Sequence, residues 1–291
     1  MRAALLLVML AACDSALDQR LAILTQPRVL AIAATPPEAR PGETVAYTAL
    51  VAGPDGAIDG ANEGATEAPP SWAFCTSPKS PTEDNSASVA CVAGEALIDL
   101  PGSSTARGAI PMDACLTFGP DTLSPGFRPR DPDPTGGYYQ PVRLVVDHLL
   151  AIGLSRVVCD LPNAPGAVAI DYRQHYVPNA SPVLHPLVYP PIHTGDSVEL
   201  RASWDEPETY LYFDQLGQVL VTRREAMRAS FFATAGAMDL DAVARGEDDP
   251  ETSGATIWHA PSNPGLQSVF IVLRDSRGGI AFQTIAMPVL P

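Results

Sequence analysis

The segment Asp131-Pro132-Asp133-Pro134-Thr135-Gly136-Gly137 contains the side chains of this sequence best spaced to bind a metal ion. Its oxygens alternate with prolines before a glycine, as in the first half of a calcium loop, so Asp131, Asp133 and Thr135 are the candidate ligands. Ca²⁺ takes about six to eight oxygens, of which this segment supplies about three. The acid expected six residues after the glycine is replaced by Val142. We favour an ordinary turn, which the same residues form readily, and keep calcium as the alternative.

The histidines and the arginine cluster of the sequence favour structural roles over metal or ligand binding. The histidines show no pair at metal-ligand spacing in a regular element, so we expect each to face solvent or to cap a turn; they are His148, His175, His185, His193 and His259. The cluster Arg223-Arg224-Glu225 with Arg228 could bind an anion. We favour a charged strand edge that discourages pairing with another chain.

Signature motifs of hydrolases and nucleotide-binding enzymes are absent from the sequence. It contains no Gly-x-Ser-x-Gly, His-Glu-x-x-His, Gly-x-x-x-x-Gly-Lys or Gly-x-Gly-x-x-Gly. We therefore predict that the protein is not an enzyme, although catalytic groups can also assemble from distant segments. The net charge of −15 argues against binding to nucleic acid or to anionic headgroups.

The N-terminus predicts export. Met1-Arg2 precedes an apolar run over residues 3–10 and then Leu10-Ala11-Ala12-Cys13. A basic start, a short apolar stretch and small residues before the cut describe a signal peptide, and the run is too short to span a bilayer. The ending resembles a lipobox, which implies acylation of Cys13. We expect a cell-envelope protein anchored by that lipid in the outer or inner membrane, facing the periplasm or the cell surface.

Four cysteines remain after Cys13, and an oxidising compartment would let them form two disulfides. Of the three possible pairings we favour Cys75 with Cys91 and Cys115 with Cys159, because sequence neighbours often meet in an antiparallel meander. The cysteine spacing does not fit a zinc site.

A weak internal repeat predicts the strands that carry these residues. Residues 41–49 and 194–202 are alike, each follows a proline pair, and each alternates apolar and polar side chains as a half-buried strand does. The aromatic segments 72–76 and 231–235 predict a central strand in each half. Residues 268–287 predict a hairpin whose turn contains Asp275 and two glycines.

The intervening segments predict loops and one helix. A short helix is expected over residues 164–176, and Pro178 and Pro182 would end it. The other expected loops are residues 56–70, residues 120–137 and the acidic tract 245–253, which we expect to be solvated.

Together these patterns predict an all-β protein of two immunoglobulin-like β-sandwiches, the first elaborated with long loops and a short helix. The expected division is a signal peptide (1–12), a lipid-anchored linker (13–25), domain 1 (26–181) and domain 2 (182–291). Residues 36–49, 127–143 and 195–279 resemble uncharacterised lipoproteins of the myxobacterial type, which carry tandem immunoglobulin-like domains. That resemblance implies a fold and a location, and no activity.

The expected function is a noncatalytic envelope module that binds a protein or glycan partner or acts as a spacer. The alternative is a calcium-dependent binder or an envelope enzyme that uses the loops of domain 1.

Overall fold

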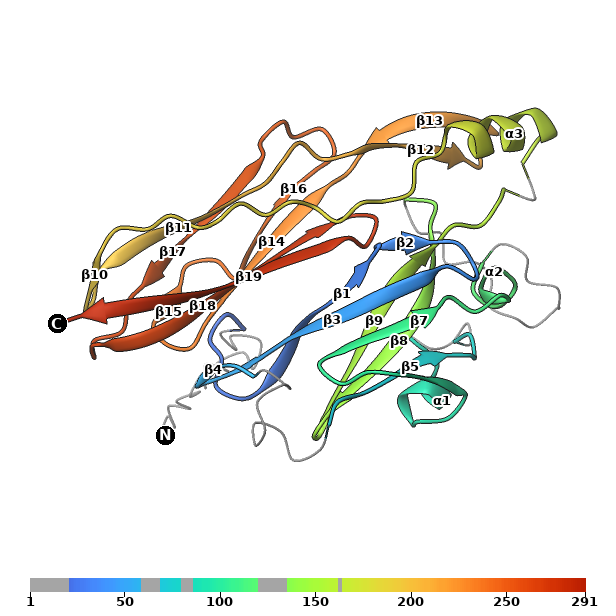
Figure 1. Cartoon of the computed structure of the whole chain (residues 1–291). Helices are drawn as coiled ribbons and strands as arrows, with labels where there is room; N and C mark the ends of the chain where they lie inside the picture. Colours follow the sequence, from blue (N-terminus) through green and yellow to red (C-terminus); the bar gives the residue numbers. More distant parts are fainter. Residues whose placement is uncertain (1–20, 59–68, 80–85, 120–134, 162–163) are drawn as a thin grey trace, which may run out of the picture.

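A computed structural model describes residues 21–58, 69–79, 86–119, 135–161 and 164–291 (Figure 1). Strands dominate these residues, as the alternating patterns predict, and the described helices are short. None of the helices in these ranges is long and apolar enough to cross a membrane. The candidate ligands Asp131 and Asp133 lie outside the described residues.

The first sandwich consists of two sheets. One sheet contains β1 (Arg28–Thr35), β3 (Thr44–Gly53), β4 (Gly56–Ala57) and β7 (Thr105–Ala109). The other has the order β2-β9-β8-β5-β6, with β2 (Glu38–Ala39), β5 (Ser71–Cys75), β6 (Leu97–Leu100), β8 (Tyr138–Val146) and β9 (Leu149–Val157). The helices are α1 (Val89–Val92), α2 (Ala114–Thr117) and α3 (Gly166–His175). The predicted helix thus forms, slightly shorter than expected.

The second sandwich repeats this plan. Its larger sheet has the order β10-β19-β18-β14-β16, with β10 (Ile192–His193), β14 (Met227–Ala233), β16 (Ala242–Arg245), β18 (Gly265–Asp275) and β19 (Ile280–Leu290). Its smaller sheet contains β11 (Ser197–Ser203), β17 (Ser253–His259) and β15 (Ala237–Met238). A separate hairpin, β12 (Thr209–Asp214) and β13 (Val219–Arg224), lies beside α3 (Figure 1).

The internal repeat is visible in the topology. In each sandwich a two-residue strand pairs in parallel with the last strand, β2 with β9 and β10 with β19. The proline pair of each repeat precedes that short strand, and the alternating segment that follows forms β3 or β11 in the opposite sheet. The aromatic segments fall on β5 and β14, which hold the same place in their sheets. The protein therefore has two immunoglobulin-like β-sandwiches.

Each sandwich has its own apolar core. In the first, Tyr47 of β3 packs against Trp72 and Phe74 of β5, with ring centroids 6.3 and 5.8 Å apart. In the second, Phe231 of β14 packs in the cluster that contains Trp258 of β17. The predicted aromatic anchors Trp72 and Phe231 are thus both buried between sheets.

The structure contains both favoured disulfides. Cys75 of β5 is bonded to Cys91 of α1, with Cα atoms 5.4 Å apart. Cys115 of α2 is bonded to Cys159, which follows β9, with Cα atoms 5.7 Å apart. One disulfide ties α1 to β5, and the other ties α2 to the chain just after β9.

The two sandwiches are packed against each other. An apolar cluster joins Leu30, Ala31, Leu50 and Ala52 of β1 and β3 to residues of β14, β18 and β19, among them Phe270. The domain boundary near Ser181 stays a prediction, but the cores on its two sides are separate and this third cluster connects them.

The structure corrects one expectation about the linker over residues 13–25. In its described part, Ala22 and Leu24 are buried, and the backbone pairs with the second sandwich. The N–H of Leu24 donates to the carbonyl of Ala233 at 2.9 Å, and the N–H of Ala233 donates to the carbonyl of Ala22 at 2.8 Å. The buried Ala22 and Leu24 are two residues apart, as on one face of a strand, so these residues belong to the folded body.

Candidate functional site

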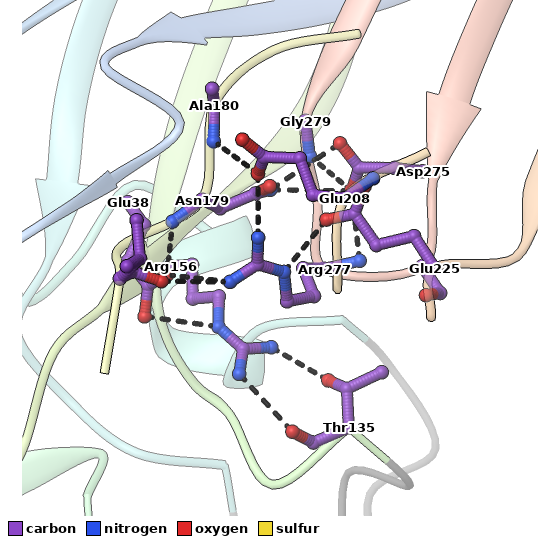
Figure 2. Close-up of polar contacts among 12 residues, drawn as sticks. Glu38, Thr135, Arg156, Asn179, Ala180, Glu208, Glu225, Asp275, Arg277 and Gly279 are labelled. Atoms are coloured by element: carbon purple, nitrogen blue, oxygen red, sulfur yellow. Dashed lines mark hydrogen bonds and ion pairs between the residues drawn. The ribbon is translucent and has the colours of Figure 1, made fainter. Parts of the chain in front are cut away.

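The most unusual polar feature of the described residues is a buried group of charges where the sandwiches meet (Figure 2). We call it the junction cluster; it consists of Glu38, Arg156, Asn179, Glu208, Glu225, Asp275 and Arg277. All of these side chains except that of Glu208 are buried. Buried charges are rare unless paired, so the contacts within the cluster decide what it can do.

Glu38 lies on β2 and binds partners from β9 and from the chain that follows α3. Its Oε1 accepts a hydrogen bond from Nε of Arg156 on β9 at 3.1 Å. Its Oε2 accepts from the backbone N–H of Asn179 at 2.7 Å, and the hydroxyl of Tyr176 donates to both oxygens at 2.7 and 2.8 Å. The parallel pairing of β2 with β9 places the carboxylate beside the guanidinium.

Arg277, in the turn between β18 and β19, reaches from the second sandwich toward the first. Its Nε donates to Oε1 of Glu225 at 2.7 Å and its Nη2 donates to Oε2 of Glu208 at 2.7 Å. Its Nη1 lies 3.8 Å from Glu38 and donates to the carbonyl of Val177 at 3.2 Å. One guanidinium thus contacts carboxylates of both sandwiches.

The chain between the sandwiches passes through the cluster and is bonded to both sides. While the N–H of Asn179 binds Glu38, its side-chain amide donates to both carboxylate oxygens of Asp275 at 3.3 Å. The N–H of Ala180 donates to Glu208 at 3.1 Å. Asp275 also accepts from the N–H groups of Arg277 and Gly279, each at 2.8 Å, which closes the hairpin turn.

Burial strongly affects the acids of this cluster. Loss of hydration and the nearby charge of Asp275, opposed by the hydrogen bond from Arg277, together raise the pKa of Glu225 to about 7. Burial also raises the pKa of Asp275, although three hydrogen bonds to that carboxylate work in the other direction. Perturbed groups of this kind mark functional sites and structural ion-pair networks alike.

The geometry favours the structural role. The two guanidinium groups already bind carboxylates of the chain, and Arg277 also lies over the ring of Tyr210, 4.7 Å from its centroid. A substrate would have to displace these contacts. The arrangement can fix two sandwiches together, and it can exchange protons with solvent at its edge, because a groove of about 400 Å³ beside β1 and β9 has Asp275 in its wall.

Thr135, the described member of the proposed calcium loop, binds the junction cluster. Its hydroxyl accepts from Nη1 of Arg156 at 2.6 Å and its carbonyl accepts from Nη2 at 3.2 Å. Both oxygens therefore face an existing cation. Within the described ranges, the structure has no group of three or more His, Cys, Asp or Glu side chains placed to hold a metal ion.

The members of the arginine cluster predicted at a strand edge bind different partners. Arg223 of β13 binds Glu247 through two hydrogen bonds of 2.9 and 2.8 Å, and Arg224 forms an ion pair with Glu206 at 2.9 Å. Glu225 corrects the expectation, because it is buried against Arg277 and does not face solvent. Glu247, in the tract predicted to be a solvated loop, is likewise bound by an arginine of the second sandwich.

Sequence reasoning missed a Ser-His-Asp relay on the smaller sheet of the second sandwich. Ser197 of β11 and His259 of β17 face each other across the ladder, with Oγ 2.9 Å from Nδ1. Nε2 of His259 lies 2.8 Å from Oδ1 of Asp239. Antiparallel register alone creates this contact, and no local sequence signal announces it.

The relay lacks other parts of an acyl-transfer site. His259 and Asp239 are solvent-exposed, where such pairs contribute little. Acyl transfer needs free donors for an oxyanion. The neighbouring N–H groups of Gly195, Asp196 and Ala260 already donate to carbonyls of the fold. Three other histidines pair with aspartates in the same exposed manner, as expected for solvent-facing residues: His175, His185 and His193.

The chain matches no protein-family model and no curated protein. Among solved structures it is similar to a lipoprotein from Bacteroides thetaiotaomicron, at 16% identity over 37% of this chain and 78% of the other, with a TM-score of 0.23. It is also similar to the adhesin InvE of Yersinia pseudotuberculosis, at 12% identity over 89% of this chain and 58% of the other, with a TM-score of 0.24. Likenesses this distant carry no functional argument.

Proposed function

We propose that this chain is a lipid-anchored, noncatalytic module of the cell envelope that holds two β-sandwiches in one fixed arrangement. The observation that carries the proposal is the contact of Arg277 with carboxylates of both sandwiches inside a buried junction. A fixed arrangement suits a spacer or a protein that presents a surface to a protein or glycan partner.

Domains joined by a linker move relative to each other by default unless their interface is large and apolar. Here three sets of contacts oppose that motion. They are the apolar cluster around Phe270, the junction cluster, and the pairing of Leu24 with Ala233. The chain at Asn179 and Ala180 is hydrogen-bonded to both sandwiches, so hinge motion would break these bonds, among them the buried bond from Asn179 to Glu38.

Distance measurements between the sandwiches test the fixed arrangement. Spin labels attached at Thr105→Cys on β7 and Glu199→Cys on β11, both exposed positions, give the distribution of distances between the two sandwiches in a frozen sample. We expect a single narrow distribution for the full chain in detergent, and two singly labelled proteins serve as controls. A broad distribution in the unaltered junction in mildly acidic solution would contradict the proposal.

The membrane anchor rests on the sequence Leu10-Ala11-Ala12-Cys13. Cys13→Ala should abolish acylation and release the protein from the membrane fraction, whereas Cys115→Ala with Cys159→Ala should leave its partition unchanged. Mass spectrometry of the mature N-terminus gives the modification directly. Membrane-associated protein with an unmodified Cys13 would overturn this part of the proposal.

A further inference from the structure

We infer that the junction cluster takes up a proton when the two sandwiches dock, so that the junction is tight in mildly acidic solution and loosens as the pH rises through neutrality. This inference rests on the fixed arrangement proposed above and adds a regulation to it. The group that carries the proton is the Glu225 carboxyl, coupled to that of Asp275.

The geometry leaves the acids of the second sandwich short of positive charge. Arg277 is shared among Glu225, Glu208 and Glu38, at 2.7, 2.7 and 3.8 Å. Its backbone N–H also binds Asp275 at 2.8 Å. One buried guanidinium cannot neutralise several carboxylates, and carboxylates that share a site do not all ionise together.

The described charged and titratable groups around Glu225 and around its partner Arg277 come from both sandwiches. The β18–β19 turn supplies Asp275 and Arg277, and the start of β12 supplies Glu208 and Tyr210. The first sandwich supplies the rest; they are Glu38 of β2, Arg156 of β9 and Tyr176 after α3. Arg156 is bound to Glu38 at 3.1 Å and to Thr135, so its positive charge mainly neutralises a carboxylate of the first sandwich.

The direction of the pH effect follows from the folded and unfolded states. Burial raises the pKa of Glu225 from 4.5 to about 7, so the docked state binds a proton that an exposed glutamate would release. The stability that this proton confers is complete below pH 4.5 and is lost as the pH rises through about 7. Separation of the two sandwiches would expose the Glu225 carboxyl. The dependence of stability on pH therefore applies equally to the docking equilibrium. For one proton, the docking constant changes by at most about tenfold per pH unit.

Replacement of Glu225 by glutamine removes the titration of this one carboxyl and leaves the other titrating groups of the protein in place. Glutamine keeps the shape and the acceptor for Arg277 without titrating. With the labels at Thr105→Cys and Glu199→Cys, the unaltered junction should give one narrow distance at about pH 5.5 and a broadened distribution at about pH 8.5, because docking is linked to the proton. Glu225→Gln should give the narrow distance at both values.

The matched control is Glu251→Gln, in the exposed part of the same sandwich; it should behave as the unaltered protein does. If Glu225→Gln does not fold, infrared spectra of the unaltered protein decide the question, since a protonated buried carboxyl should be present at the lower pH and lost at the higher. Equal distributions at both pH values, or the absence of that carboxyl band, would overturn the inference. A distribution already broad at the lower pH would instead contradict the fixed arrangement itself.

Discussion

The backbone N–H of Asn179 donates a hydrogen bond of 2.7 Å to Oε2 of Glu38, a residue 141 positions earlier in the chain. Through this bond the segment that leaves the first sandwich is attached to the sheet from which it departs. Since the side chain of Asn179 binds Asp275 of the second sandwich, one residue connects both bodies.

Arg277→Met should be strongly destabilising, by about 3–5 kcal/mol, because it removes the cation from a buried group of carboxylates. Urea unfolding of the full chain measures this free energy. Arg201→Met is the matched control, since Arg201 forms an exposed ion pair with Glu199 at 2.9 Å and should cost at most about 1 kcal/mol. Similar losses for both variants would mean that the junction charges do not hold the fold.

The two disulfides should contribute unequally. Closing the loop between Cys75 and Cys91, which are 16 residues apart, stabilises the fold by about 3 kcal/mol in the chain-entropy model. The pair Cys115 and Cys159 is separated by 44 residues and should contribute about 1 kcal/mol more. Unfolding of the two double-alanine variants without reductant checks the order, and peptide mapping checks the pairing. A larger loss for the shorter loop would contradict the entropic account.

Leu24→Ala should destabilise the protein by about 2–5 kcal/mol, because Leu24 is buried in the cluster between the sandwiches. Leu21→Ala, at a side chain that is 53% exposed, should change stability by less than about 0.5 kcal/mol. Hydrogen exchange at the N–H of Ala233 gives a local readout, because that group donates to Ala22. Unchanged protection of this amide in Leu24→Ala would show that the N-terminal pairing does not depend on Leu24.

Calcium should leave the melting temperature unchanged. The Thr135 oxygens bind Arg156, which would repel a second cation, and Asp131 and Asp133 alone offer too few ligands. Melting the full chain in millimolar Ca²⁺ and then in chelator checks this. Binding to the folded state would instead stabilise it, by about 2.7 kcal/mol at one hundred times the dissociation constant. Loss of that effect in Asp131→Ala would establish the calcium loop.

Patterns of local origin were predictable from the sequence. The alternation around Val45 and Val198 forms matching strands, and the Asp275 turn closes the last hairpin, because strand periodicity and turn chemistry act between neighbours. The junction cluster was not predictable. Arg277 resembles any turn residue in sequence, and its partners Glu38 and Glu225 lie in segments with no pattern in common with it.

Glu225 shows why local reasoning failed there. Beside Arg223 and Arg224 it resembles part of an exposed charged strip, and those two arginines are indeed paired near the surface. Glu225 lies in the short connection between β13 and β14, where its side chain is buried and the β18–β19 turn provides the cation. A buried acid of this kind becomes recognisable only when the tertiary contact is known.

The packing of the first sandwich on the second also has a consequence for biosynthesis. Nη2 of Arg274 donates to the carbonyl of Leu30, 244 residues earlier, so the face of β1 is completed only by the last hairpin of the chain. Until β18 and β19 have emerged, the first sandwich exposes the apolar surface of Leu30, Ala31 and Leu50. Exposed surface of this type promotes association and capture by chaperones. A chain that ends near Ser181 would therefore expose the face that the second sandwich normally covers, and chaperones would bind it there.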